Sequence, residues 1–224
     1  MKLNVKVEDI PFGTSIQEVA VPEVLKTKVP TGLTYFDDAL GGKGFTPSMV
    51  TLFIGTPGAG KTTMMLTLAN SIARSGNVAL FNTAEESLHQ IKMTTDRLRL
   101  RSSFLVGAET HVPTLLAGCD KIRAANPGKH FFLIVDSLQT LDDGYFNSGR
   151  ITSATAERAL QMLTNYAKEY AINVIVIGQV TKDGKMAGTQ KLKHMVDAMM
   201  ALDVERKDEE LRGCRVLTTE KNRF

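Results

Sequence analysis

The sequence predicts an α/β fold in which helices cover both faces of a mostly parallel central sheet. Short runs rich in Val, Ile, Leu and Phe alternate with segments whose apolar residues recur at helical spacing, a pattern typical of strand–helix–strand units. A glycine-rich turn ends the first of these runs, and an aspartate ends a later one. Because such folds bind ligands at the carboxyl ends of their strands, both motifs are expected at one edge of the sheet.

Composition is that of an ordinary globular protein. The chain has 224 residues, of which 43% are hydrophobic and 23% charged, which suits one domain and argues against extensive disorder. The formal net charge of +3 permits a nucleic-acid partner without demanding one. Cys119 and Cys214 form no C-x-x-C pair, which argues against a zinc ribbon or disulfide scaffold and favours a cytoplasmic setting. No run approaches the roughly 18 apolar residues of a membrane span, so no membrane partner is expected.

Two parts of the chain differ in pattern. Residues 1–30 mix Pro, Val, Lys and Glu without clear periodicity, which predicts an N-terminal arm or linker, and residues 31–224 carry the alternating pattern of the core. The core should open with a short helix at 31–40, which the glycines of GGKG end. The helix contains an F-x-x-A pattern (Phe36–Ala39), which some recombinases use for subunit contact and which we interpret here as core packing.

Further elements follow from periodicity, apolar runs and turn residues. The predicted strands are 48–55, 75–83, 103–107, 130–136 and 173–179, and the predicted helices are 61–74, 88–100, 115–125 and 155–170. Residues 199–204 and 215–221 predict two antiparallel strands that extend the sheet at one edge, joined by the charged turn 205–213.

Residues 55–62, GTPGAGKT, fit the phosphate-loop pattern G-x-x-x-x-G-K-[ST] at every fixed position. In that motif the backbone N–H groups point inward, the lysine reaches the β- and γ-phosphates, and the final hydroxyl binds Mg²⁺. A chance glycine-rich turn is the alternative, but this segment follows a predicted buried strand and opens a predicted helix, the context that the motif requires. ATP and Mg²⁺ are therefore the predicted ligands. The predicted contacts are Gly55, Thr56, Pro57, Gly58, Ala59, Gly60, Lys61, Thr62 and Thr63, with Lys61 also catalytic and Thr62 also a metal ligand.

Polar side chains stand at the ends of three other predicted strands. Asp136 suits a Mg²⁺ site, although a helix N-cap or a polar strand end would also explain it. Either Glu85 or Glu86 is placed to orient and deprotonate an attacking water, and the alternative is an acidic helix start. Gln179 is placed to sense the γ-phosphate, or simply to make a strand-terminal hydrogen bond.

Together these features resemble the RadA/Sms family, a bacterial branch of the RecA-like ATPases. The resemblance runs from Thr31 to Phe224 and rests on five ordered segments, which are more specific together than any one alone. They are the entry into the phosphate loop at 31–63, FNTAEESLHQ at 81–90, LIVDSLQT at 133–140, GQVTKDGKMAGTQKLKHMVD at 178–197 and EKNRF at 220–224.

The resemblance implies a RecA-like core that works as a hexameric ring ATPase, binds single-stranded DNA, drives branch migration in recombination and has a RecA-type recombinase as a further partner. It assigns Glu85, rather than Glu86, as the base, Asp136 as the Mg²⁺-associated acid and Gln179 as the sensor. In related ring helicases such as DnaB, a lysine and an arginine two positions apart project into the neighbouring subunit's nucleotide site, which corresponds here to Lys221 and Arg223. The family also carries a four-cysteine zinc finger and a Lon-protease-like domain, which these 224 residues do not contain, so we expect the ATPase core alone.

Two segments are candidates for DNA contact. Residues 180–194 form a basic, glycine-containing segment able to follow a phosphate backbone, and residues 142–150 offer aromatic side chains for base stacking. An ordinary solvated loop is the alternative for each. The candidate contacts are Lys182, Lys185, Lys191 and Lys193 in the first segment and Tyr145, Phe146 and Arg150 in the second.

Three functions therefore compete. The first is a DNA-dependent ring ATPase, and the second is a nucleotide-switched assembly protein resembling KaiC, which acts on protein partners without DNA. A phosphotransferase acting on a small substrate is the weakest, because no lid-like or acceptor-binding cluster stands out in the sequence. The basic segment after Gln179 favours the first over the second.

Overall fold

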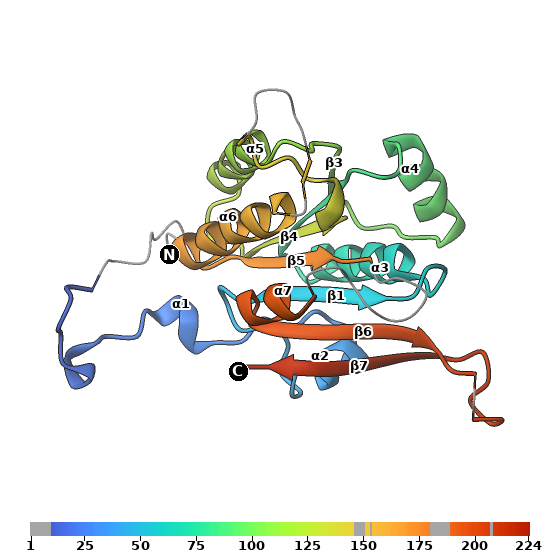
Figure 1. Ribbon diagram of the computed structural model, residues 1–224, viewed down its shortest axis with the longest axis horizontal. Helices are drawn as coiled ribbons and strands as arrows, with labels where there is room; N and C mark the ends of the chain where they lie inside the picture. Colours follow the sequence, from blue (N-terminus) through green and yellow to red (C-terminus); the bar gives the residue numbers. More distant parts are fainter. Residues whose placement is uncertain (1–9, 146–150, 153, 180–188, 207) are drawn as a thin grey trace.

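A computed structural model of the chain describes residues 10–145, 151, 152, 154–179, 189–206 and 208–224. Among these residues seven strands form one sheet, in the order β3-β2-β4-β5-β1-β6-β7 (Figure 1). The strands are β1 (Val50–Gly55), β2 (Val78–Thr83), β3 (Leu105–Gly107), β4 (Phe131–Asp136), β5 (Asn173–Ile177), β6 (Ala198–Val204) and β7 (Arg215–Asn222).

Strand β7 alone runs against the other six. The expected antiparallel pairing of the last two strands is confirmed, with Val204 opposite Arg215 and Ala198 opposite Asn222. Strand β6 itself lies parallel to β1, with Gly55 opposite Leu202. Figure 1 shows the β7 arrow pointing opposite to those of β1, β5 and β6. As a result, β7 begins at the carboxyl edge of the parallel strands and ends at their amino edge.

Helices cover both faces of the sheet, as predicted. Along β1, Val50, Leu52 and Ile54 join one core cluster, which holds apolar residues of α5, α6 and α7. Phe53 belongs to the second cluster, which contains residues of α2, α3 and α4. Because alternate strand residues point to opposite faces, a strand buried on both sides reads as a continuous apolar run. The helices are α1 (Glu23–Lys26), α2 (Thr34–Ala39), α3 (Lys61–Arg74), α4 (Leu88–Arg97), α5 (Val112–Ala125), α6 (Thr155–Tyr170) and α7 (Thr189–Met195), with 3-10 turns η1 (Ile16–Glu18) and η2 (Leu138–Thr140).

The segment before the sheet packs differently from the rest. Its elements η1 and α1 contain no buried residue, and Figure 1 shows the blue segment before α1 lying apart from the sheet and the chain returning toward it through α1. Close packing begins at Val29, whose backbone forms an antiparallel bridge with Phe45. Phe36 in α2 is fully buried and stacks on the rings of Phe45 and Phe53. Phe36 therefore contributes to the core, and the division into an arm (1–30) and a core (31–224) stays a prediction.

Membrane insertion through a helix finds no support in the described part of the chain, where no helix combines the length and apolar character needed to cross a bilayer.

Candidate functional site

The phosphate loop connects β1 to α3 and depends on glycine at two points. A Cβ atom on Gly55 would lie 2.2 Å from the Leu202 carbonyl oxygen of β6, so a side chain there would collide with the neighbouring strand. Gly60 has φ 96° at the residue that caps α3, a left-handed conformation that L side chains rarely adopt. These constraints shape a loop whose N–H groups and helix N-terminus together form an anion site.

Lys61, the first residue of α3, lies over this loop. Its Nζ donates hydrogen bonds to the carbonyl oxygens of Gly55 (2.8 Å) and Thr56 (3.2 Å). Burial lowers the pKa of Lys61, and the nearby carboxylates of Asp136, Glu85 and Asp203 oppose that shift. The ammonium group is therefore held at the mouth of the loop, where a phosphate oxygen can replace the carbonyls as its partner.

Thr62 and Asp136 meet where β1 and β4 end. The Thr62 hydroxyl donates to Asp136 Oδ2 at 2.7 Å, and Asp136 is only 5% exposed. Burial raises the pKa of Asp136 to about 6; the Thr62 hydrogen bond opposes this, and Glu85 and Glu86 add to it. Among the described residues no group of three or more His, Cys, Asp or Glu side chains is arranged to enclose a metal. A hydroxyl beside one carboxylate suits Mg²⁺, which takes few protein ligands and keeps waters and phosphates as the others.

Glu85 is tied to the same edge by two neighbours. Its Oε1 accepts hydrogen bonds from Gln179 Nε2 at 2.6 Å and from the Ser137 hydroxyl. Glu86 takes a different position: its carbonyl oxygen accepts from the Thr83 hydroxyl at 3.1 Å. The two adjacent acids therefore differ in position, and the Glu85 side chain is the one hydrogen-bonded to the residues that follow β4 and β5.

A cavity of about 340 Å³ brings most of the predicted nucleotide-site residues together. Glu85 lines it and Glu86 does not, and Ile177 is an added apolar contact. The volume falls in the range of small-molecule sites, roughly 300–1,000 Å³. Its lining consists of Pro57, Gly58, Gly60, Lys61, Thr62, Thr63, Glu85, Asp136, Ile177 and Gln179.

Lys221 and Arg223 lie away from this cavity, at the opposite edge of the sheet. Lys221 pairs with Met199 at the start of β6, whereas the loop residue Gly55 pairs with Leu202 further along it. At about 3.3 Å per residue, these positions are roughly 10 Å apart along the sheet before the side chains diverge. Within one chain, the predicted lysine–arginine pair is thus separated from its own phosphate loop.

Arg215 is a site residue that the sequence reasoning missed. It is the first residue of β7, and its Nε donates to the Ala59 carbonyl oxygen of the phosphate loop at 2.8 Å. A Cβ on Gly60 would lie 2.9 Å from the same nitrogen, so the guanidinium rests directly on the loop. No sequence pattern marks Arg215, because only the β6–β7 register places it there.

The predicted DNA contacts are placed in part. Lys191 forms an ion pair with Glu157 of α6, and Lys193 pairs with Glu220 of β7 at 3.3 Å. The Arg158 guanidinium lies 4.5 Å from the ring centre of Tyr145, which is 69% exposed. DNA contact stays a prediction for all of these side chains. Lys182, Lys185, Phe146 and Arg150 lie outside the described residues.

Comparison with known proteins places these features in a family. A family model described as "ATPase: KaiC" matches residues 29–101. The DNA repair protein RadA of Mycobacterium tuberculosis (strain CDC 1551 / Oshkosh) is 37% identical over 202 residues, which cover 87% of this chain and 39% of that protein. RadA of Streptococcus pneumoniae (strain ATCC BAA-255 / R6) is 33% identical over 210 residues, which cover 93% and 47%. The chain spans less than half the length of these relatives.

Solved structures with low sequence identity share the fold. One of them, the structure of an isolated ATPase domain, has a TM-score of 0.73 at 16% identity, covering 90% of this chain and 86% of that one. A DnaB-like replicative helicase has a TM-score of 0.72 at 17% identity, covering 88% and 57%. Sheet order, phosphate loop and relatives agree: the chain has the fold of the RecA-like ATPases and is similar, over most of its own length, to one part of the DNA repair protein RadA.

Proposed function

We propose that the chain is a DNA-dependent ATPase of RadA type that hydrolyses ATP, binds single-stranded DNA as a ring oligomer and acts in recombination and branch migration. The observation that carries this proposal is the convergence of Lys61, Thr62, Asp136, Glu85 and Gln179 on one cavity beside the phosphate loop. Residues from four strands or their following loops meet there, which suits in-line attack of water on a bound triphosphate.

Each side chain has a role that its position supports. Lys61 neutralises charge on the transferring phosphoryl group, and Glu85 orients the attacking water and accepts its proton. Gln179, hydrogen-bonded to Glu85 at 2.6 Å, would report the state of the γ-phosphate to the chain that follows it. Thr62 and Asp136 would hold Mg²⁺, which would supply positive charge to neutralise the bound triphosphate.

The neighbouring subunit would complete the site. Lys221 and Arg223 lie too far from their own phosphate loop to act on it. The Arg223 side chain is 52% exposed, so it is accessible to a neighbouring subunit. A guanidinium supplied in trans stabilises the transition state of phosphoryl transfer and adds about 10³-fold or more to the rate. This division of the site between chains is what favours a ring oligomer over an active monomer.

DNA is the proposed polymer partner, and a RecA-type recombinase is a further proposed partner. The relatives are named DNA repair proteins, and residues 180–194 carry the predicted basic segment. A KaiC-like assembly ATPase that acts on protein partners without DNA is the second candidate, supported by the family model matched at residues 29–101.

ATP turnover with and without single-stranded DNA, over a series of salt concentrations, separates the two candidates. The proposal expects DNA to stimulate turnover and salt to weaken DNA binding, because phosphate contacts release counterions. Lys61→Ala should abolish turnover under every condition, whereas Lys92→Ala, on the exposed side of α4, should not. Turnover without DNA stimulation and without salt-sensitive binding would favour the assembly ATPase.

A further inference from the structure

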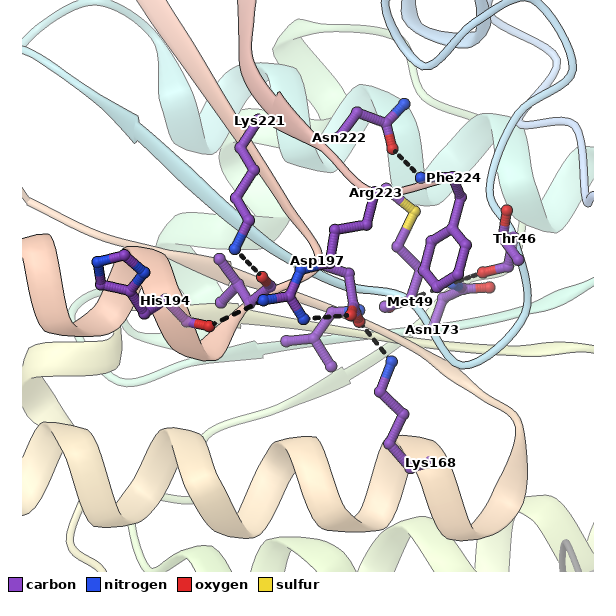
Figure 2. A network of polar contacts seen from close by, with 12 residues as sticks. Thr46, Met49, Lys168, Asn173, His194, Asp197, Lys221, Asn222, Arg223 and Phe224 are labelled. Carbon is purple, nitrogen blue, oxygen red and sulfur yellow. Dashed lines mark hydrogen bonds and ion pairs between the residues drawn. The ribbon is translucent and has the colours of Figure 1, made fainter. Parts of the chain in front are cut away.

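We infer that Asp197 is the positioning residue for Lys221 and Arg223: together with the last carbonyl oxygens of α7, it docks both side chains at the edge from which they reach a neighbouring subunit. This inference rests on the proposed trans role of Arg223 and gives a role to Asp197, the last residue of the segment 178–197, to which the sequence analysis assigned none. Figure 2 shows the dock, with Asp197 between α7, β7 and the Lys168 side chain of α6.

Asp197 is a buried carboxylate shared by three elements. It is only 5% exposed, and its Oδ2 accepts hydrogen bonds from the Val50 backbone N–H at 3.0 Å and from Lys168 Nζ at 2.5 Å. Its other oxygen, Oδ1, lies 3.7 Å from Arg223 NH1. A buried charge is tolerated when it is paired and hydrogen-bonded, and here two cations and one backbone N–H surround it.

Backbone contacts fix Arg223 in the same place. Its N–H donates to the Asp197 carbonyl oxygen at 3.1 Å, and its NH2 donates to the His194 carbonyl oxygen at 3.3 Å. A guanidinium has five N–H donors, so these contacts leave others available. Because the Arg223 side chain is still 52% exposed, it is oriented within its own chain while its remaining donors can face another molecule.

Lys221 is docked by the end of the same helix. Its Nζ donates to the carbonyl oxygens of Lys193 and Val196, both at 2.7 Å. The last carbonyls of a helix have no partner within it, and cations near a helix C-terminus are stabilised by those groups. Burial lowers the pKa of Lys221, and the adjacent Arg223 adds to that shift, while Asp197 opposes it. Asp197 thus offsets the repulsion between two cations that the dock brings together.

Preorganisation gives this arrangement a consequence for catalysis. A long side chain that is already oriented loses less conformational freedom when it engages a transition state. Removing the Asp197 charge should therefore affect the chain that donates Arg223, and leave the nucleotide site of that same chain intact. A purely structural role for Asp197 would impair both, which makes the two roles separable.

A subunit-mixing experiment exploits this difference. Lys61→Ala chains keep the lysine–arginine pair without a working phosphate loop, and Arg223→Ala chains keep the loop without the arginine. If Arg223 acts in trans, an equal mixture hydrolyses ATP faster than either variant alone. Asp197→Asn is then added either to the Lys61→Ala donor or to the Arg223→Ala acceptor, and the mass of the mixed oligomer is measured to confirm assembly.

We expect Asp197→Asn in the donor to lower kcat of the mixture about tenfold, with KM for ATP within about twofold, because the contact that is weakened, between Arg223 and the transferring phosphoryl group, contributes only in the transition state. The same change in the acceptor should leave kcat within about twofold. Asp96→Asn in the donor is the matched control, since Asp96 also pairs with a lysine but lies on the exposed face of α4.

Equal losses in the two arrangements would show that Asp197 is structural and would overturn the inference, as would no loss in either or a donor that no longer assembles. A mixture of the Lys61→Ala and Arg223→Ala chains that shows no gain would instead overturn the trans role in the proposed function, and the inference with it.

Discussion

The carboxyl and amino ends of the parallel strands differ in whether one chain supplies a whole binding site there. At the carboxyl edge, Lys61, Thr62, Asp136, Glu85 and Gln179 line one cavity, in which Thr62 is hydrogen-bonded to Asp136 and Gln179 to Glu85 within a single chain. At the amino edge, Lys221 and Arg223 are held in position by Asp197 and α7, but no phosphate loop is within their reach. Under the proposed function, the carboxyl edge would bind the nucleotide and the amino edge would hold the two cations that serve a neighbouring subunit.

Strand β7 connects the two edges physically. It begins with Arg215 on the phosphate loop and ends beside Asp197, because it runs antiparallel to β6 over its whole length. The following predictions test the two edges separately, from the largest expected effect to the smallest.

Arg223→Ala should lower ATP turnover of the assembled protein about 10³-fold, since a trans arginine stabilises charge only in the transition state. Nucleotide affinity, measured by equilibrium binding, should change little. Arg212→Ala, in the exposed turn before β7, serves as the control. Isolated monomers that hydrolyse ATP at the full rate of the assembly would contradict the proposed action of Arg223 on a neighbouring subunit's nucleotide.

Glu85→Gln should lower kcat about 10²-fold or more, because a carboxamide cannot accept the proton of the attacking water. ATP should still bind, since the phosphate loop and Asp136 are unchanged. The neighbouring acid supplies a matched control: Glu86→Gln removes the same charge outside the cavity and should keep most of the activity. A larger loss for Glu86→Gln, measured by phosphate release, would reverse the assignment.

Arg215→Ala should weaken ATP binding about tenfold, because a hydrogen bond from a charged donor contributes about 1.5–3 kcal/mol. The change removes the contact with the Ala59 carbonyl oxygen and a positive charge beside the phosphates. A titration with a fluorescent ATP analogue measures the effect, with Arg212→Ala again as the control. An unchanged affinity would mean that Arg215 merely packs against the loop.

His130, which directly precedes β4 and does not line the nucleotide cavity, should give a small pH effect on folding. Burial lowers its pKa from the ordinary value of 6.5, although the hydrogen bond to Asn173 opposes the shift. Below about pH 6.5 the His130 imidazole of the unfolded chain binds a proton, whereas that of the folded chain stays neutral. The free energy of unfolding therefore decreases as the pH falls below about 6.5, by at most about 1.4 kcal/mol per pH unit. The free energy of unfolding, measured with urea between about pH 7 and pH 5, should decrease less steeply with falling pH in His130→Gln than in the unchanged chain. The same pH dependence in both proteins would refute this prediction.

Local pattern was enough for most of the fold, since α3, β4 and β5 were predicted from periodicity, apolar runs and turn residues. Helix α5 shows where that approach weakens: it begins at Val112 rather than at the predicted residue 115. Pro113 is tolerated in the first turn because the N–H that proline lacks has no partner there in any helix. Boundaries of this kind depend on a few residues and on packing, which periodicity does not resolve.

By itself the sequence determined the phosphate loop, the strand-end carboxylates and the α/β architecture, because each depends on residues close together in the chain or on a repeated period. The tertiary structure alone decided which distant residues meet: Arg215 on Ala59, Gln179 on Glu85, and Asp197 on Arg223. These contacts depend on strand order and register, in particular on β6 lying between β1 and the reversed β7. A shift of one residue in that register would turn the β7 side chains to the other face of the sheet, and no local pattern specifies it.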